Sequence, residues 1–383
     1  MTAFVESCTK TAGSSAAAAA RSSRGRPKAR QLLRALADKK NILVTTHEHA
    51  DPDALASCIG LQNLLQLQLG AATQVTISIK GAYGGGVNAA FAELIDFHPV
   101  RWDESSLSNY DAIILLDTQP SFRNNPLPSN LMPLAVIDHH RGRRKLTCPF
   151  CDIRPDVGAT SSIVFSYFME LEQKISPGLG ATLVFGIESD LAGAAGTPDE
   201  LDNVALSSLT LIADPRKLYN MRYVDLPQNV FVSYAQGLNN AVYYDNALVS
   251  HLDVSPSPER PAVIADFLLR FENVKWALVT GVMDNQLLLS LRAYRGKISA
   301  AELMKRLVRQ IGEGGGHRTK AGGVIPLTGT PGEVDRLRSI IRRRYLRALG
   351  IKAVKPQRLI PRGDMMLPPA PRTSAKQPEP TVA

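Results

Sequence analysis

The chain alternates short apolar runs with longer segments in which apolar residues recur every three or four positions. Strand-like runs, each four to six residues long, cover 42–46, 74–79, 112–116 and 134–137. Segments with helical spacing cover 53–69, 91–95, 159–171, 179–185 and 202–212. Strands that alternate with helices are typical of βαβ units around a parallel sheet. The runs without polar interruption indicate strands buried on both faces. We therefore predict an α/β domain with a parallel sheet over residues 31–225.

A second pattern follows after a polar stretch at 226–240, which contains Pro227 and is predicted to be a linker. Two apolar strands, 274–282 and 287–291, flank a short polar turn and predict a β-hairpin. Helical spacing then appears twice before residue 348. This mixture predicts a smaller α+β domain over 241–348.

Charge is distributed unevenly along the 383 residues, whose formal net charge is +9. The segments 1–30 and 351–383 together carry 12 of the 44 basic residues and 3 of the 35 acidic residues, so the remainder is neutral. The ends are rich in Ala and Ser or in Pro, and we expect 1–30 and 349–383 to be disordered basic tails. Long nucleic acid is therefore not an expected partner, except through these tails.

Targeting signals and cysteines add little to this organisation. No apolar run approaches the roughly 20 residues that span a bilayer. The Ala-rich stretch at 16–20 is too short for a signal peptide, and basic residues follow it, so we expect a cytoplasmic protein, with an organelle transit segment as the open alternative. Cys148 and Cys151 form a single C-x-x-C pair, which we interpret as two reduced thiols because a zinc site needs about four ligands.

Metal-binding residue types gather where the predicted strands end. Six such side chains stand at or after strand and helix ends: His47, Asp51, Asp53, Asp117, His139 and Asp190. The carboxyl ends of parallel strands share one edge of a sheet, where α/β folds bind ligands. Four carboxylates in one cleft repel each other, and two divalent cations would balance them. Mixed carboxylate and imidazole ligation suits Mn²⁺, with Mg²⁺, Co²⁺ or Fe²⁺ as alternatives. Any one of these residues alone has a simpler interpretation, since Asp53 can cap the helix that follows it.

The second domain contains a glycine-rich segment that is suited to phosphate. Gly314, Gly315 and Gly316 allow backbone N–H groups to approach an anion closely, and His317 and Arg318 add charge beside them. The hairpin places Arg292 on the face opposite its leucines, where a guanidinium can bind a phosphate in bidentate fashion. A glycine turn that merely ends the preceding helix is the alternative.

Taken together, these motifs resemble the DHH phosphoesterase family with its DHH-associated C-terminal domain. The N-terminal resemblance rests on His47-x-x-x-Asp51-x-Asp53, Asp117, Asp138-His139-His140, residues 157–162 and Ser189-Asp190. The C-terminal resemblance rests on Gly314-Gly315-Gly316-His317 and residues 321–323. The subgroup that the chain is most similar to is the nanoRNase and 3′-phosphoadenosine 5′-phosphate phosphatase type.

The resemblance implies two cations and a role for each motif residue. One cation would be held by His47, Asp51 and Asp117, and the other by Asp53, Asp117, His139 and Asp190. His140 would face the scissile phosphate, and Asp138 would orient the imidazoles. The substrate would be bound by Arg292, Gly315, Gly316, His317 and Arg318, which places the active site in the cleft between the two domains. Relatives of this type also imply a homodimer.

The expected function is a two-metal-dependent phosphoesterase, an oligoribonuclease-like hydrolase with exonuclease action on short substrates. Its expected substrates are short oligonucleotides, linear or cyclic dinucleotides and 3′,5′-bisphosphate nucleotides. Residues 191–195 lack the aromatic side chain that nanoRNases often carry there, which leaves the substrate preference open. An inorganic pyrophosphatase similar to family II and a non-catalytic nucleotide-binding regulator remain as alternatives.

Overall fold

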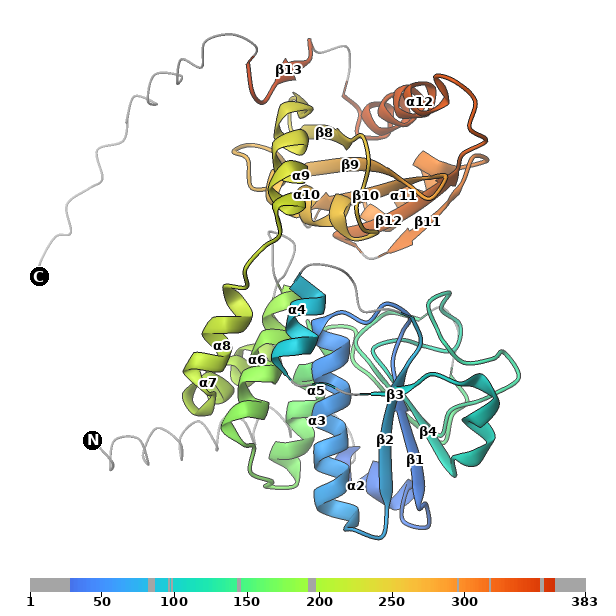
Figure 1. Cartoon of the computed structure of the whole chain (residues 1–383), viewed down its shortest axis with the longest axis vertical. Coiled ribbons are helices and arrows are strands. Elements are labelled where there is room, and N and C mark those ends of the chain that lie inside the picture. The colour runs from blue at the N-terminus through green and yellow to red at the C-terminus, as the bar shows by residue number, and fades with distance from the viewer. Residues whose placement is uncertain are drawn as a thin grey trace, which may run out of the picture.

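Two sheets organise the computed structural model of the chain, one above the other in Figure 1. The structure describes residues 28–81, 87–95, 97, 99–142, 146–191, 198–294, 296–316, 318–351 and 355–361. Most of each expected tail therefore lies outside the described residues. Among the described helices, none has the length and apolar character needed to cross a membrane.

The N-terminal sheet has six parallel strands in the order β3-β2-β1-β4-β5-β6. Its strands are β1 (Asn41–Thr45), β2 (Gln74–Ile79), β3 (Val100–Arg101), β4 (Ala112–Leu116), β5 (Ala135–Asp138) and β6 (Phe150–Ile153). The chain runs outward from β1 through β2 to β3, and then returns to the other side of β1 with β4. This reversal makes the carboxyl ends of β1 and β4 a topological switch point, where α/β sheets place their ligand sites.

Both faces of this sheet are buried, as the apolar strands predict. Alternate residues such as Val44, Ile114 and Ile137 belong to a large core under the helices on one face. Their neighbours Leu43 and Leu115 belong to a smaller core on the other face, beside the 3₁₀ helix η1 (Glu104–Asn109). The helices of this domain are α2 (Lys28–Ala35), α3 (Pro52–Leu69), α4 (Val87–Leu94), α5 (Thr160–Glu170), α6 (Pro177–Leu191), α7 (Glu200–Ile212) and α8 (Pro215–Arg222). Figure 1 shows α3, α5 and α6 together on one side of the strands.

The C-terminal sheet is mixed and has the order β11-β12-β10-β9-β8-β7-β13. Its strands are β7 (Val242–Tyr244), β8 (Ala247–Leu252), β9 (Trp276–Met283), β10 (Gln286–Ala293), β11 (Glu313–Gly316), β12 (Lys320–Pro326) and β13 (Gln357–Arg358). The predicted hairpin is confirmed, because β9 and β10 pair across Asp284 and Asn285, both with positive φ. Its helices are α9 (Gln228–Asn239), α10 (Arg260–Leu268), α11 (Ala300–Val308) and α12 (Glu333–Ala348).

The structure differs from the sequence predictions at several boundaries. The predicted linker 226–240 contains helix α9, which buries only Val230, Ser233 and Gly237 and leaves Phe231 and Val232 exposed, so its apolar residues do not all lie on one buried face. Helix α2 begins at Lys28, inside the expected N-terminal tail, and strand β13 lies inside the expected C-terminal tail. The interpretation of the C-x-x-C pair as reduced thiols is wrong for this structure, because Cys148 and Cys151 are joined by a disulfide.

Candidate metal centre and phosphate-binding face

The loop from β1 to α3 carries the first candidate ligands. His47 lies two residues after the end of β1 and is 9% exposed. Asp51 is the N-cap of α3, where its Oδ1 accepts a hydrogen bond from the N–H of Ala54 at 3.0 Å. This cap fixes the start of the helix and leaves the other carboxylate oxygen of Asp51 available. The sequence analysis considered capping only as an alternative role for Asp53, and the structure assigns the cap to Asp51.

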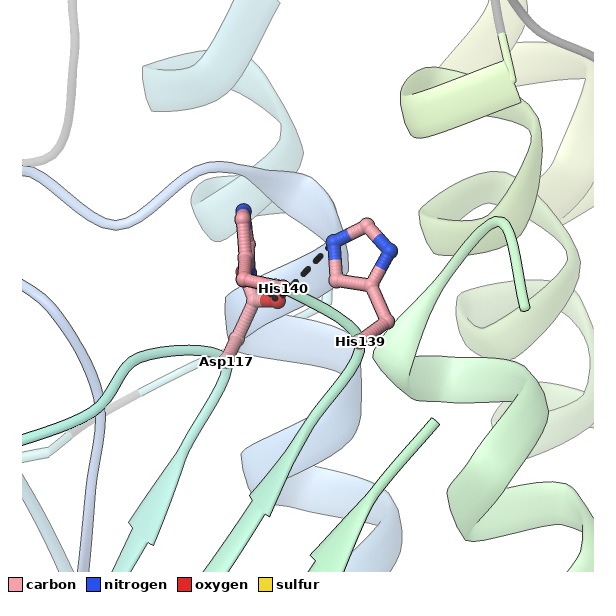
Figure 2. Close-up of side chains that lie close together, drawn as sticks. All are labelled: Asp117, His139 and His140. Carbon is pink, nitrogen blue, oxygen red and sulfur yellow. Dashed lines mark ion pairs between the residues drawn. The ribbon is translucent and has the colours of Figure 1, made fainter. Parts of the chain in front are cut away.

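Asp117 lies at the centre of the site, directly after β4. Its backbone has a φ of 55°, in the left-handed region that non-glycine residues enter at a cost. The side chain is nearly buried, and its oxygens lie 3.5 Å from His47 Nε2, 3.4 Å from His139 Nε2 and 3.6 Å from His140 Nδ1. Figure 2 shows Asp117 and the two histidines converging from neighbouring strand ends. The strained backbone is thus located where three imidazoles meet one carboxylate.

His139 and Asp190 complete the cluster from β5 and the last turn of α6. His139 Nε2 lies 3.2 Å from Asp190 Oδ2, and its Nδ1 lies 3.3 Å from the carbonyl oxygen of Val157. The Nε2 atom is buried and has no hydrogen-bond partner among the described residues. If Nδ1 carries the proton and donates it to Val157, the lone pair of Nε2 points into the cluster. A buried imidazole nitrogen that makes no hydrogen bond and lies between two carboxylates is the arrangement that a metal ion satisfies.

Asp53 and Asp117 are held in place by the start of helix α5. The two oxygens of Asp53 accept the backbone N–H groups of Thr160 at 2.7 Å and Ser161 at 2.9 Å. The hydroxyl of Thr160 donates to Asp117 Oδ1 at 2.8 Å. Thr160 therefore contacts both carboxylates, a role that sequence reasoning did not assign to it. Such outer contacts orient metal ligands before any metal arrives.

Asp138 is fully buried and holds His140. Its Oδ1 lies 2.6 Å from His140 Nδ1, and its Oδ2 accepts a hydrogen bond from Gln119 Nε2 at 2.8 Å. Gln119 Nε2 also donates to the carbonyl oxygen of His140. No pattern in the sequence pointed to Gln119. The resemblance implied that Asp138 orients both imidazoles, whereas here it contacts His140 and a backbone carbonyl positions His139.

All six predicted ligands come together at the switch point. Candidate ligand atoms lie within 4.8 Å of one another in three groups: His47, Asp51 and Asp117; Asp53, His139 and Asp190; and Asp117, His139 and His140. The first two groups divide the six residues into two sets of three. We call these six residues the carboxylate–histidine cluster. Its oxygen and nitrogen donors, together with the unpaired Nε2 of His139, fit divalent cations.

Burial and neighbouring charges shift the pKa values of the cluster residues in opposite directions. Burial alone lowers the pKa of His47, but its hydrogen bond to Asp117 and the charges of Asp51 and Asp117 raise it to about 10. Burial works the other way on Asp117, and the surrounding histidines hold the pKa of that carboxyl below its usual value. Burial and the charges of Asp117 and Asp190 raise the pKa of Asp53 well above normal. Bound cations would replace these protons.

The C-terminal sheet contributes a face of a different kind. In the register of β10, β11 and β12, Gly315 pairs with Gly322, Gly322 with Ser290, and Lys320 with Arg292. Directly paired residues of neighbouring strands point to the same side of the sheet. We call the side formed by Arg292, Gly315, Lys320 and Gly322 the open glycine face. A Cβ added at Gly315 would meet no atom within 4 Å, so this face offers bare backbone.

Packing and backbone conformation, not an open surface, explain why the neighbouring positions 314 and 316 are glycine. A Cβ at Gly314 would lie 2.7 Å from Met304 Cγ, because helix α11 packs on the opposite side of the sheet. Gly316 has a φ of 140°, which favours glycine, and a Cβ there would lie 2.4 Å from the carbonyl oxygen of Lys320. The glycine motif therefore combines one open position with two that the packing and backbone require.

Of the side chains predicted to bind phosphate, Arg292 and Arg318 lie within the described residues. Arg292 donates from Nε to Asp266 Oδ1 at 2.8 Å and from Nη1 to Ser290 Oγ at 3.0 Å. Arg318 is exposed and donates to the carbonyl oxygen of Gly296 at 3.0 Å. His317 lies outside the described residues.

Within the part of the chain that the structure describes, two polar contacts join the open glycine face to the N-terminal domain. Lys320 Nζ donates to the backbone oxygen of Asp190 at 2.8 Å and lies 3.3 Å from its Oδ1. Arg123, in the loop after β4, forms a two-pronged ion pair with Glu313 of β11. Glu313 points to the same side of β11 as Gly315, two residues away. The face therefore lies against the end of the sheet that carries the cluster, and sequence reasoning missed Lys320.

Comparison with known proteins identifies the family. Residues 41–187 match the DHH family, N-terminal domain, and residues 245–345 match the DHHA1 domain. The chain therefore carries a DHH N-terminal domain that is followed by a DHHA1 domain.

Two relatives place this assignment in context. The uncharacterized protein MJ1633 of Methanocaldococcus jannaschii is 29% identical over 325 residues, which cover 82% of this chain and 65% of that protein. The chain thus spans less than two thirds of that relative's length. The crystal structure of an exopolyphosphatase-related protein from Bacteroides fragilis is 18% identical, with a TM-score of 0.68, and covers 85% of this chain and 98% of its own. This chain therefore shares the DHH phosphoesterase-like fold, and the similarity extends over nearly the whole of the Bacteroides fragilis structure.

Proposed function

We propose that the protein is a two-metal-dependent phosphoesterase that hydrolyses short oligonucleotides, dinucleotides or 3′,5′-bisphosphate nucleotides. The observation that carries the proposal is the carboxylate–histidine cluster, with four carboxylates and two imidazoles at the switch point of a DHH-family sheet. A phosphoester hydrolase acts on anions, and a wall of carboxylates repels them unless cations intervene. The family membership and the chemistry of the cluster therefore support the same class of reaction.

The ligand sets of the proposal follow the geometry. His47, Asp51 and Asp117 would hold one cation, and Asp53, His139 and Asp190 would hold the other. The resemblance to the family adds Asp117 as a shared ligand of the second cation. When bound, two divalent cations stabilise charge on a phosphoryl group and lower the pKa of an attacking water. Manganese is the proposed ion because hard oxygen ligands and imidazoles are mixed.

The chain's own residues would position and protonate the substrate. Asp138 holds Nδ1 of His140 at 2.6 Å, which fixes the ring and places Nε2 on its far edge. From there His140 would contact the scissile phosphate and donate a proton to the leaving oxygen. On the opposite wall, the backbone at Gly315 and the side chain of Arg292 would contact a second phosphate of a short substrate. The open glycine face thereby limits the length of chain that fits.

The proposal is tested by a substrate panel with purified protein and Mn²⁺. The panel contains 5′-labelled di- to pentanucleotides, a cyclic dinucleotide, a 3′,5′-bisphosphate nucleotide, pyrophosphate and polyphosphate. We expect mononucleotide release from one or more of the nucleotide substrates and loss of that activity in Asp117→Asn. A matched control is Asp38→Asn, because the Asp38 side chain is 77% exposed and its one ion pair among the described residues is with its neighbour Lys39. Release from pyrophosphate alone would favour an inorganic pyrophosphatase, and tight binding without turnover would favour a nucleotide-binding regulator.

A further inference from the structure

Lys320 places a positive charge from the C-terminal domain directly on the carboxylate–histidine cluster. Its ammonium lies 3.3 Å from Asp190 Oδ1 and donates to the Asp190 backbone oxygen at 2.8 Å. The second carboxylate oxygen of Asp190 lies 3.2 Å from His139 Nε2. Asp190 is thus shared between an imidazole of its own domain and a lysine of the other.

A divalent cation would compete with the Lys320 ammonium for the carboxylate of Asp190. Asp53, His139 and Asp190 form a group whose ligand atoms lie within 4.8 Å of each other. A cation held there would lie a few ångströms from the Lys320 ammonium, and like charges at that distance repel strongly in a partly buried site. Lys320 is 26% exposed and has a flexible four-carbon stem, so it has room to move.

The surface beside Lys320 provides a second position for its ammonium group. Lys320 pairs directly with Arg292 across β12 and β10, and Gly322, two residues on, leaves the adjoining surface bare. Two cationic side chains beside a stretch of backbone that no side chain covers suit a phosphate group. We propose that Lys320 is the resident counter-ion of Asp190 in the metal-free protein and that metal binding releases it to contact the phosphate of the substrate on the open glycine face. This inference rests on the proposed function and adds a positioning role that links metal loading to substrate binding.

Manganese titration calorimetry on the full chain tests the exchange. Lys320→Met keeps the stem and removes the charge, so we expect it to bind Mn²⁺ about tenfold more tightly than wild type, within the ~5- to 150-fold range of typical couplings between sites. With Mn²⁺ saturating, adenosine 5′-monophosphate is expected to bind the same variant at least about fivefold more weakly. Unchanged or weaker manganese binding would overturn the proposal, and unchanged nucleotide binding would overturn its second step.

Arg123→Ala is the matched control, because it removes the other ion pair between the same two domains. We expect its manganese affinity to stay within about twofold of wild type. An equal gain in both variants would assign the effect to domain contact in general and would overturn the role of the Lys320 charge.

A measurement on the unaltered protein covers the case in which the variant does not fold. Acetylation of Lys320, followed by mass spectrometry, should become faster when Mn²⁺ is added, while acetylation of Lys28, which donates to the backbone oxygen of Cys151, should not change. Equal protection of Lys320 with and without Mn²⁺ contradicts the exchange. Manganese uptake by wild type tests the proposed function separately, since uptake without any effect at Lys320 defeats only this inference.

Discussion

The two sides of the proposed site differ in construction. We call the carboxylate–histidine cluster the N-terminal or crowded wall, and the open glycine face the C-terminal or bare wall. The N-terminal wall is a crowded set of charged side chains, most of them largely buried and several oriented by a neighbour, as Asp53 is by the N–H groups that begin α5. The C-terminal wall is nearly bare, with space above Gly315 and few fixed partners. The crowded wall is suited to hold cations in one geometry, and the bare wall is suited to admit a ligand. Changes to the first should therefore abolish chemistry, whereas changes to the second should alter binding.

The largest expected effect is on the crowded wall, at Asp117. Asp117→Asn removes the charge that three imidazoles approach, while Asn tolerates the same left-handed backbone. A shared metal ligand contributes several kcal/mol to transition-state stabilisation, so we expect kcat/KM to fall by about 10³-fold or more. Initial rates and the number of bound Mn²⁺ ions measure it. Retention of both rate and metal stoichiometry would remove Asp117 from the centre of the site.

A smaller effect is expected at Asp138, which touches His140 and not the proposed cations. Asp138→Asn should lower kcat by roughly 10- to 100-fold, the usual cost of losing a group that orients an active-site residue. Manganese stoichiometry should stay at the wild-type value. A parallel loss of metal would show that Asp138 supports the ligands themselves, and a normal rate would remove it from the mechanism.

The pH dependence of metal binding tests whether His47, on the crowded wall, is a metal ligand. The pKa of His47 is raised to about 10 in the metal-free protein, so at pH 7 the imidazole is protonated and must lose its proton to bind a cation. Loss of the His47 proton alone should therefore make manganese affinity rise with pH by up to about tenfold per unit, and this contribution should level off as pH approaches 10. Calorimetry at pH 6.5–8.5, in two buffers of different ionisation enthalpy, reports the released proton. A pH-independent affinity would mean that His47 is not a ligand.

The smallest effects compare adjacent glycines on the bare wall. Gly314→Ala drives a Cβ to within 2.7 Å of Met304 Cγ, and such overpacking typically costs about 1–3 kcal/mol of unfolding free energy. Gly315→Ala meets no atom within 4 Å, so its melting temperature should stay near wild type while KM rises. Thermal unfolding and initial rates on both variants make the comparison. The interpretation of an open face fails if Gly315→Ala destabilises the fold and leaves KM unchanged.

The sequence predicted the crowded wall better than the bare one, for a physical reason. Strands β2 and β4 have the bounds that their apolar patterns predict, and parallel strands bring their carboxyl ends to one edge whatever the packing details. The contact of Lys320 with Asp190 joins residues 130 positions apart and depends on how two domains meet. No local pattern encodes such a contact. Helix α9 was missed for a related reason, since few of its residues are buried and its apolar spacing is weak.

The left-handed backbone at Asp117 restricts which residues can be exchanged there. A β-branched residue at that position would disturb the turn as well as the charge, whereas Gly would relax the turn and leave the imidazoles without an anion. A saturation library at codon 117 would consequently sort substitutions along two separable axes, soluble yield and metal uptake. Variants that express well but take up no metal would give inactive, correctly folded protein for trapping an uncleaved ligand in a crystal.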